Sequence, residues 1–294
     1  MPNTFNQING VMMAVQIHHH AEMLGDVERI AAFRKAIHET VRPGDVVVDV
    51  GAGLGLLASS ALDAQAGHVT AIEYVPQLAA LATEILSDTP IQVLTGRSYD
   101  IHLSPPPDVI VTETIGPVGP EENIVEIAYD LKCRYPNLQR MIPRRMKLHA
   151  QALFSSSVSA DREMVLENIN SSSMGNFDPD RARAALDRAY CEQVYQGDLS
   201  KAEPKSERLY LADYLLGVSE TSDFSVVLSL PITNDWNAVA ISFEAELSET
   251  ITLSNNYLDV KTHWLNSYIA RLSESSVLQV AYDSDTTSFI IHWL

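Results

Sequence analysis

Short apolar runs alternate with amphipathic segments through the first half of the chain, and this alternation constrains the fold most strongly. Val46 to Val50 is a continuous apolar run apart from Asp49, as expected of a parallel strand buried on both faces. The same reasoning predicts strands at Val69 to Glu73, Ile91 to Leu94 and Val109 to Thr112. Strands that alternate with helices form βαβ units, so the sequence predicts a doubly wound parallel sheet.

Four segments have the apolar spacing of amphipathic helices. They are Glu22 to about Glu39, Leu54 to Gln65, Pro76 to Leu86 and Glu121 to Leu131. Arg42-Pro43-Gly44 ends the first of them, because proline and glycine both interrupt a helix.

Beyond Pro143 polar and apolar residues alternate, which is typical of an antiparallel sheet or barrel with one exposed face. The predicted strand-rich stretches are Lys147 to Phe154, Phe224 to Leu230, Ala238 to Leu247, Ile251 to Leu253, Leu278 to Tyr282 and Ser288 to Trp293. A helical insert at about 158–198 interrupts them. We therefore expect an N-terminal helical segment (1–40), a parallel-sheet domain (41–143) and a β domain with a helical arm (144–294).

A glycine-rich turn follows the strand at 46–50. The segment D-V-G-A-G-L-G, residues 49–55, lets the backbone turn tightly and approach a ligand closely. The helix that follows adds unpaired N–H groups. The spacing is shorter than in the G-x-G-x-x-G fingerprint, as in many sheets that bind S-adenosylmethionine (AdoMet). A tight turn without any ligand is the alternative interpretation.

Glu73 ends the second predicted strand, twenty residues after Gly53. A carboxylate there can accept hydrogen bonds from both hydroxyls of a ribose. NAD has the same requirement, so this acid does not distinguish AdoMet from NAD. Ser98 follows the third strand, where it could meet an adenine edge or simply form a turn.

Glu113 and Glu122 lie on either side of a Gly/Pro-rich loop after the fourth strand. This layout can direct two carboxylates into one pocket. Such a pair suits a cationic ligand, because a guanidinium presents planar donors that match carboxylate oxygens. The alternative for Glu122, which follows Glu121, is that it only favours a helix N-terminus.

Charge and composition limit the classes of ligand and partner that the protein is expected to bind. The net charge of −18 disfavours nucleic acid and is compatible with a cationic substrate. No apolar run reaches eighteen residues, so we expect no membrane span. Cys133 and Cys191 lie far apart, which fits a reducing compartment and hence the cytoplasm. No Cys/His set completes the triplet His18-His19-His20, so we expect no metal site.

Several motifs in order resemble the protein arginine N-methyltransferase family, which belongs to the class I AdoMet-dependent methyltransferases. These motifs are H-A-E-M-L-G-D-V-E-R (20–29), V-V-V-D-V-G-A-G-L-G (46–55), the two glutamates, M-I-P (141–143) and Thr262-His263-Trp264. The resemblance is close from Gln16 to Glu126 and looser beyond. It implies a Rossmann-like AdoMet-binding domain, an antiparallel β-barrel-like domain and a homodimer formed through the helical arm.

The resemblance also implies roles for individual residues, with AdoMet as cofactor and S-adenosylhomocysteine (AdoHcy) as product. Glu113 and Glu122 would clamp the guanidinium, and His263 would lie beside Asp26 between the two domains. The residues on the cofactor side would be Arg29 at the AdoMet carboxylate, Glu73 at the ribose, Asp49, Gly51 and Gly53 at the turn, and Ser98, His20 and Met23 nearby.

Two carboxylates can support methyl transfer to a guanidinium. They hold it and localise its positive charge away from the attacking nitrogen. One carboxylate, or the Asp26–His263 pair, could take the proton late in the reaction.

Several positions depart from the family pattern. Thr114 and Ile115 stand where Trp and Met are usual, Tyr99 stands where an acid is usual, and residues 1–20 contain no Tyr. Prolines at 106, 107, 117 and 120 alter the pocket loops. The acceptor therefore stays open between a protein or peptide arginine and free arginine or another small guanidine. The alternatives are another nitrogen acceptor and a non-catalytic dimeric regulator.

Overall fold

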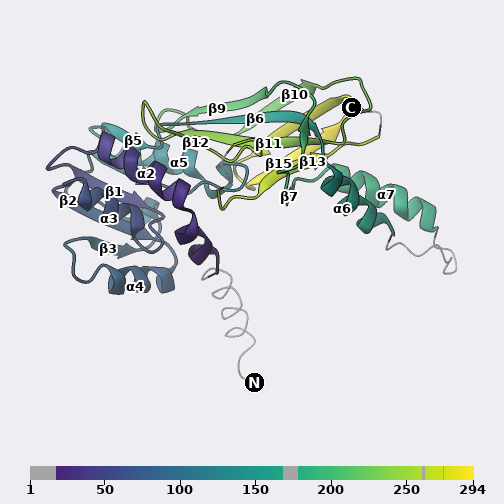
Figure 1. The fold of residues 1–294 in the computed structure, drawn as a ribbon. Coiled ribbons are helices and arrows are strands. Elements are labelled where there is room, and N and C mark those ends of the chain that lie inside the picture. The colour runs from purple at the N-terminus through teal and green to yellow at the C-terminus, as the bar shows by residue number, and fades with distance from the viewer. Residues whose placement is uncertain (1–17, 168–177, 260–261, 274) are drawn as a thin grey trace.

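The computed structural model describes residues 18–167, 178–259, 262–273 and 275–294. It has two bodies joined along one side, with a pair of helices that projects from the second body (Figure 1). The first body is a parallel sheet with flanking helices, and the second consists of antiparallel strands.

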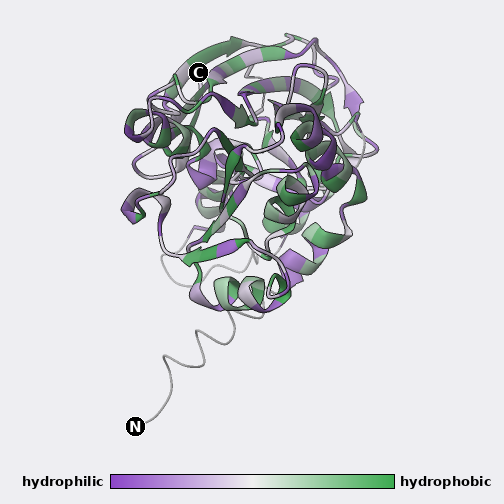
Figure 2. Ribbon diagram, turned by 90° about the vertical axis from the view of Figure 1, so that its left-hand side faces the viewer, coloured by the Kyte–Doolittle hydropathy of each residue, from purple (hydrophilic) through white to green (hydrophobic). Residues whose placement is uncertain are grey.

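Five parallel strands form the first sheet, in the order β3-β2-β1-β4-β5. They are β1 (Val46–Val50), β2 (His68–Glu73), β3 (Gln92–Thr95), β4 (Val109–Thr112) and β5 (Arg140–Ile142). The chain order reverses on either side of β1, and ligands of open parallel sheets bind at the carboxyl edge of such a reversal. Apolar residues concentrate on the central strands, while the helices carry both kinds of residue (Figure 2).

The helices of this body are α2 (Val27–Thr40), α3 (Leu56–Asp63), α4 (Pro76–Ile85) and α5 (Ile124–Arg134). The single helix predicted from Glu22 to Glu39 is wrong, because the helix over residues 18–25 is separated from α2 by Asp26. Asp26 has non-helical dihedral angles, and its carboxylate caps α2 by accepting the N–H of Arg29 at 3.0 Å.

Two helix starts fall later than predicted, and each follows a residue with positive φ. Gly55 (φ 84°) precedes α3, which starts at Leu56 instead of Leu54. Asn123 (φ 61°) precedes α5, which starts at Ile124 instead of Glu121. Glu122 therefore belongs to the short 3₁₀ helix η2 (Pro120–Glu122) and not to α5.

The second body contains a seven-stranded and a three-stranded antiparallel sheet. Its strands are β6 (Arg145–Phe154), β7 (Tyr195–Gly197), β8 (Glu203–Pro204), β9 (Leu209–Leu215), β10 (Phe224–Ser229), β11 (Ala238–Glu246), β12 (Thr252–Ser254), β13 (Asn266–Ala270), β14 (Val277–Asp283) and β15 (Ser288–Trp293). The long strands β6 and β11 pair at the centre of the larger sheet. Strands β5, β7, β8, β9 and β13 were not predicted from the sequence.

Within the helical insert predicted at about 158–198, the structure has α6 (Ser156–Glu167) and α7 (Pro179–Cys191), which project from the β body (Figure 1). Residues 195–197 of that range form strand β7 instead, and residues 168–177 lie outside the described residues. An ion pair between Arg162 and Asp187 at 2.7 Å joins the two helices. Tyr190 donates a hydrogen bond to Asp161 at 2.6 Å. Buried Val158, Tyr190 and Cys191 pack the base of the arm against the β body, so the arm is anchored there.

The two bodies share one apolar core that includes Ile115 and Val118 from the first and Phe243 and Trp264 from the second. Trp264 Nε1 donates to the carbonyl oxygen of Ile115 at 3.0 Å, and the rings of Trp264 and Phe243 meet edge to face. This contact fixes the loop after β4 against the β body. None of the helices that the structure describes is long and apolar enough to span a membrane.

Candidate active site

A cavity of about 680 Å³ opens at the carboxyl edge of the parallel sheet. This is where the strand order reverses, as ligand sites of such sheets require. Seven of the site residues predicted from the sequence line it: His20, Met23, Gly51, Glu73, Ser98, Glu113 and Glu122. A small pocket of about 40 Å³ shares His20, Met23, Gly51 and Glu113 with it and adds Arg29 and Gly53.

Gly51 of the glycine turn lines both the cavity and the small pocket, and Gly53 lines the small pocket. Gly51 and Gly53 both have positive φ, 72° and 54°, a region that side chains disfavour. A Cβ on Gly51 would lie 2.6 Å from Cγ2 of Thr114, and one on Gly53 would lie 2.9 Å from the ring of His20. Both positions therefore require glycine to keep the cavity open.

Asp49 lies behind this turn and does not line the cavity. Its Oδ2 accepts the N–H of Ala58 at 2.8 Å, which ties β1 to the start of α3. Its Oδ1 is buried and has no hydrogen-bond partner among the described residues. Burial raises the pKa of Asp49 to about 7, against the bond from Ala58 and with a smaller contribution from the nearby Glu73.

Glu73 ends β2 at the cavity wall, as the sequence predicted. Its carboxylate accepts the N–H of Gly53 at 2.8 Å and the N–H of Val75 at 2.7 Å. These bonds orient the acid, which remains part of the lining. Ser98, at the start of η1 (Ser98–Asp100), also lines the cavity, and its carbonyl oxygen accepts a bond from Arg134 at 2.7 Å.

Glu113 follows β4 and forms a buried ion pair with Arg29, with Nη1 and Oε2 2.7 Å apart. The sequence reasoning gave these residues different ligands, whereas the structure joins them directly. Burial raises the pKa of Glu113, the Arg29 guanidinium opposes that rise, and Glu122 adds to it. Arg29 Nη2 also donates to the carbonyl oxygen of Met23 at 2.9 Å, so the guanidinium bridges two walls.

Glu122 and its neighbour Glu121 have different surroundings. Glu122 lines the cavity, and burial followed by repulsion from Glu121 and Glu73 raises its pKa to about 6. Glu121 accepts the N–H groups of Val118 and Gly119 at 2.9 and 2.7 Å and so holds the loop. Glu121 therefore holds the loop in place, whereas Glu122 faces the cavity.

Asp26 and His263 meet at the junction of the two bodies. Asp26 Oδ2 lies 2.6 Å from the backbone N and 3.0 Å from Nδ1 of His263. Burial lowers the pKa of His263 to about 4, against the effect of Asp26. Burial alone would raise the pKa of Asp26, but N–H donors from Arg29 and His263 lower it. A neutral His263 therefore donates Nδ1–H to an ionised Asp26.

The Asp26–His263 pair lies beside the main cavity and not in its lining. His19, which does line it, has its ring centre 5.7 Å from that of His263. Burial lowers the pKa of His20, which contacts the Gly53 position. Within the part of the chain that the structure describes, no cluster of three or more His, Cys, Asp or Glu residues could hold a metal ion.

The positions that depart from the family pattern have defined contacts. The Thr114 hydroxyl lies 3.1 Å from that of Thr112, and its methyl group covers Gly51. Ile115 is buried and joins the two bodies through its carbonyl oxygen. Sequence reasoning missed Leu78 and Asn123 in the lining, because neither residue belongs to a recognisable motif.

These features define a Rossmann-like parallel-sheet domain followed by an antiparallel β body. No family model matches the chain. An arginine N(omega)-methyltransferase of Streptomyces achromogenes subsp. streptozoticus is 27% identical over 264 residues, 85% of this chain and 70% of that protein. Protein arginine N-methyltransferase 1.1 of Arabidopsis thaliana is 33% identical over 152 residues, 49% of this chain and 38% of that protein.

Solved structures agree in fold. Protein arginine methyltransferase 10 of Arabidopsis thaliana superimposes with a TM-score of 0.70 at 18% identity, covering 94% of this chain and 96% of the other. The Trypanosoma brucei PRMT1 enzyme–prozyme heterotetrameric complex with AdoHcy gives a TM-score of 0.69 at 17% identity, covering 89% and 86%. In sequence and in fold this chain is therefore similar to protein arginine N-methyltransferases.

Proposed function

We propose that this protein transfers a methyl group from AdoMet to a guanidino nitrogen of arginine. The observation that carries the proposal is that Glu113 and Glu122 line the same cavity as the glycine turn and Glu73. Donor and acceptor would then meet in one space. The names of the sequence relatives support the same activity.

The residues present fit AdoMet as the cofactor. The turn keeps Cβ atoms away at Gly51 and Gly53, and Glu73 offers a fixed carboxylate beside it. Glu73 would hold the ribose hydroxyls, Ser98 would contact the adenine, and Arg29 would pair with the carboxylate. When bound, AdoMet supplies an electrophilic methyl group on a positively charged sulfur.

Glu113 and Glu122 would hold the acceptor guanidinium through bidentate bonds. Their combined charge would draw positive charge away from the attacking nitrogen and raise its nucleophilicity. The pKa of Glu122, raised to about 6, lies close to neutral pH, which suits a group that accepts a proton late in the reaction. Asp26 and His263 would keep the N-terminus of α2 against the β body and so position Arg29.

The Arg29–Glu113 ion pair suggests how donor and acceptor binding are coupled. A guanidinium already occupies Glu113 in this structure. A cofactor carboxylate near Arg29 would compete for that guanidinium and release Glu113 for the acceptor. The Glu113 carboxylate could therefore pair with Arg29 before the cofactor binds and with the substrate guanidinium afterwards.

We also propose a homodimer formed through the α6–α7 arm. Support comes from the projection of the arm and from Leu186, an apolar side chain on α7 that is 48% exposed. The two free cysteines, Cys133 and Cys191, support a reducing compartment and hence a cytoplasmic location.

The test is AdoHcy formation with a panel of acceptors: free arginine, an arginine-containing peptide, lysine and a buffer blank. Arginine-dependent turnover supports the proposal. Turnover with lysine alone would favour a different nitrogen acceptor. AdoMet binding without turnover on any acceptor would favour a non-catalytic regulator. The ratio of free arginine to peptide turnover assigns the acceptor size.

A further inference from the structure

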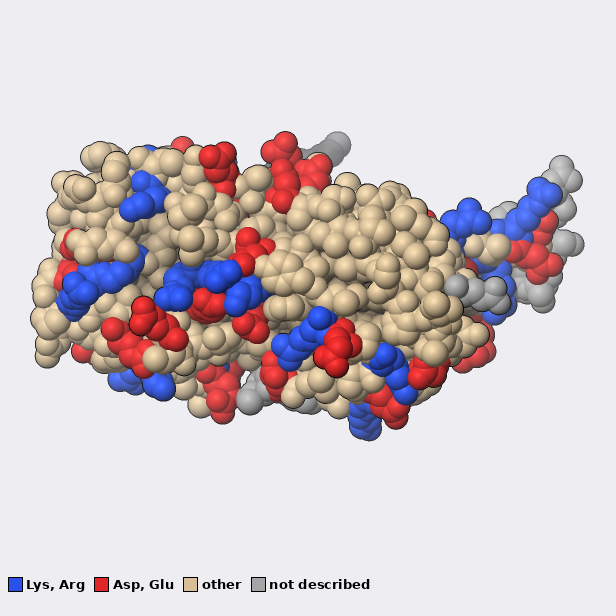
Figure 3. All heavy atoms as spheres, turned by 90° about the horizontal axis from the view of Figure 1, so that it is seen from above, with Lys and Arg blue, Asp and Glu red and all other residues tan. Residues whose placement is uncertain are grey.

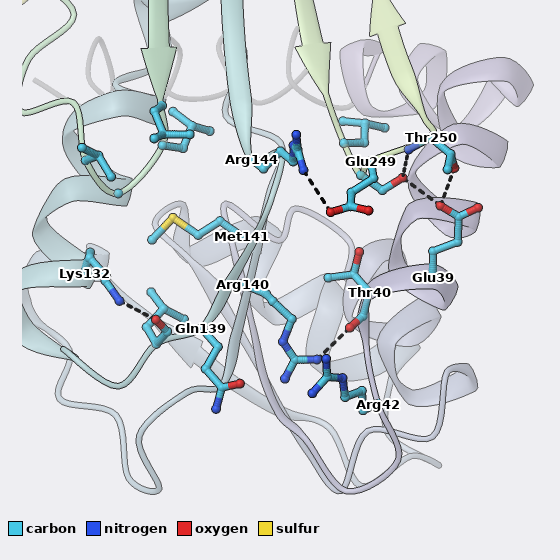
Figure 4. A pocket seen from close by; sticks show the side chains of 17 residues that line it. Glu39, Thr40, Arg42, Lys132, Gln139, Arg140, Met141, Arg144, Glu249 and Thr250 are labelled. Carbon is cyan, nitrogen blue, oxygen red and sulfur yellow. Dashed lines mark hydrogen bonds and ion pairs between the residues drawn. The ribbon is translucent and has the colours of Figure 1, made fainter.

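A second cavity, of about 690 Å³, lies between the two bodies and shares no lining residue with the first (Figure 4). Its walls come from the end of α2, the start of β5, the turn after β9 and the turn between β11 and β12. Because Arg140 begins β5, this cavity lies at the amino edge of the parallel sheet. The candidate active site lies at the opposite, carboxyl edge.

Charge sets this cavity apart from the rest of the molecule. Its lining contains the four basic residues Arg42, Lys132, Arg140 and Arg144 and the two acidic residues Glu39 and Glu249. The whole chain shows the reverse bias, with 20 basic and 38 acidic residues. Figure 3 shows that basic and acidic side chains lie close to one another on the face seen from above. A basic lining within an acidic protein concentrates positive potential locally.

Two of these cations, Lys132 and Arg42, form no ion pair within the described residues, although the charge of Arg42 helps to lower the pKa of the Asp45 carboxyl. Lys132 Nζ donates to the carbonyl oxygens of Pro136 and Leu138, which are neutral acceptors. The Arg42 side chain forms no hydrogen bond or ion pair with any residue that the structure describes. Figure 4 shows it next to Arg140, which is itself paired with Asp45 at 2.9 Å.

The other charged residues of the lining include Arg144 and Glu39, and both have partners within the described residues. Arg144 Nε lies 3.4 Å from Glu246, and Arg144 Nη1 lies 3.7 Å from Glu249, whose side chain is 89% exposed. The Arg144–Glu249 pair is exposed and long, so it contributes little and an anion could replace it. Glu39 accepts hydroxyl hydrogen bonds from Ser248 and Thr250 at 2.8 and 2.7 Å, which hold its carboxylate at the rim.

The cavity also has an apolar wall, formed by Leu138, Met141, Leu216, Val218 and Leu247. Its volume falls within the range of about 300–1,000 Å³ typical of small-molecule sites. A ligand that matches both surfaces has a compact anionic group and an apolar part.

We propose that this cavity binds a small organic anion, a carboxylate or phosphate on an apolar group, held by Arg42, Lys132 and Arg144. Guanidinium groups suit either oxyanion, because both present oxygens at matching spacing. The ligand would bridge the two bodies. It would also lie at the end of α2 opposite to Asp26 and Arg29, so its binding is expected to stiffen the helix that carries them. This proposal is independent of the methyl-transfer reaction.

Isothermal titration calorimetry with phenyl phosphate and with phthalate tests the proposal, and benzamide serves as the uncharged control. Each titration is repeated after saturation with AdoHcy. We expect one site per chain for at least one anion, weakened by added NaCl because its charges are solvent-accessible. In the double variant Arg42→Gln/Arg144→Gln the affinity should fall by about tenfold or more, since two charge-assisted hydrogen bonds are lost.

The variant Arg34→Gln removes the same charge from the exposed face of α2 and should leave the affinity unchanged. Binding of phenyl phosphate alone or phthalate alone would assign the anion class. The proposal is overturned if neither anion binds, if benzamide binds equally well, if the double variant binds like the wild type, or if AdoHcy abolishes binding.

Discussion

Asp26, Asp49 and Glu122 are acidic side chains near one cavity, yet their surroundings shift their pKa values in different directions. Burial raises the pKa of Asp49 and of Glu122. Asp26 is also buried, but N–H donors reach it from Arg29 and His263, so its pKa is lowered. Asp26 accepts hydrogen bonds from two backbone N–H groups and the His263 side chain, which together outweigh its burial, whereas the single N–H that reaches Asp49 does not. Burial and neighbouring carboxylates dominate at Glu122, which is therefore suited to exchange a proton.

The first prediction concerns the raised pKa of Glu122. A base must be deprotonated to act, so kcat/KM should fall as the pH drops through about 6. Rates of AdoHcy formation between pH 5 and pH 9 measure this limb. The variant Glu122→Gln should lack it and lose roughly 100-fold in activity at pH 8. Glu84→Gln, an exposed control on α4, should show the same fall in kcat/KM below pH 6 as the wild type. If Glu122→Gln also shows this fall, Glu122 is not the base.

The second prediction concerns His263, whose pKa is lowered from 6.5 to about 4 in the folded state. Below pH 6.5 the unfolded chain binds the proton more readily, so folding stability is lost as the pH falls towards 4. The shift corresponds to on the order of 3 kcal/mol. Urea unfolding at several pH values measures it.

The matched variant is His263→Asn, whose side-chain amide can donate to Asp26 without titrating. Its stability should change less over the same pH range than that of the wild type. Equal pH dependence in the two proteins would show that His263 does not carry the effect.

At the scale of elements, sequence periodicity predicted the parts of the fold that depend on continuous apolar runs. Strands β1, β2 and β4 were predicted because they are buried on both faces. Strand β5 has only three residues, too few to show a period, and β13 ends in an apolar run without a flanking turn signal. Strand β9 reads L-Y-L-A-D-Y-L, where its alternation is interrupted.

Sequence periodicity does not predict which helices and strands contact one another. Asp26, where the helix breaks, also accepts a bond from His263, 237 residues away in sequence. The Arg29–Glu113 pair spans 84 residues. The motifs identified these residues as candidates for the site. Which of them contact one another depends on how the two bodies pack.

The third prediction tests the glycine turn. Gly53→Ala places a Cβ 2.9 Å from the ring of His20 at a φ of 54°. We expect a loss of about 1 kcal/mol in stability from the backbone conformation alone. AdoMet affinity, measured by calorimetry, should fall by about tenfold or more, because the turn or His20 must shift.

Gly25→Ala is the control, since a Cβ at Gly25 meets nothing within 4 Å and its φ is not positive. This variant should bind AdoMet like the wild type. A Gly53→Ala protein with unchanged affinity would remove the turn from the proposed cofactor site.

At the scale of the whole molecule, α2 connects the regions where the two bodies meet. Its N-terminus carries the Asp26–His263 pair, and Glu39 near its C-terminus bonds Ser248 and Thr250. Both ends of one helix therefore contact the β body. This arrangement relates the candidate active site at one sheet edge to the basic cavity at the other.

The fourth prediction concerns assembly through the arm. Leu186→Arg places a charge on the exposed face of α7, where the side chain is 48% exposed. Sedimentation velocity at micromolar concentration should show a dimer for the wild type and a monomer for this variant. Ile85→Arg, at a helical site that is 58% exposed, should remain dimeric. A monomeric wild type would contradict the proposal.

The most direct test of the central claim is mass spectrometry of arginine after incubation with AdoMet and either the wild type or Glu113→Gln. We predict that the wild type produces arginine methylated on a guanidino nitrogen. Glu113→Gln should slow this product by about 100-fold or more, because the buried carboxylate that would bind the guanidinium is neutralised. Wild-type protein that binds AdoMet but leaves free and peptide arginine unmethylated would contradict the account.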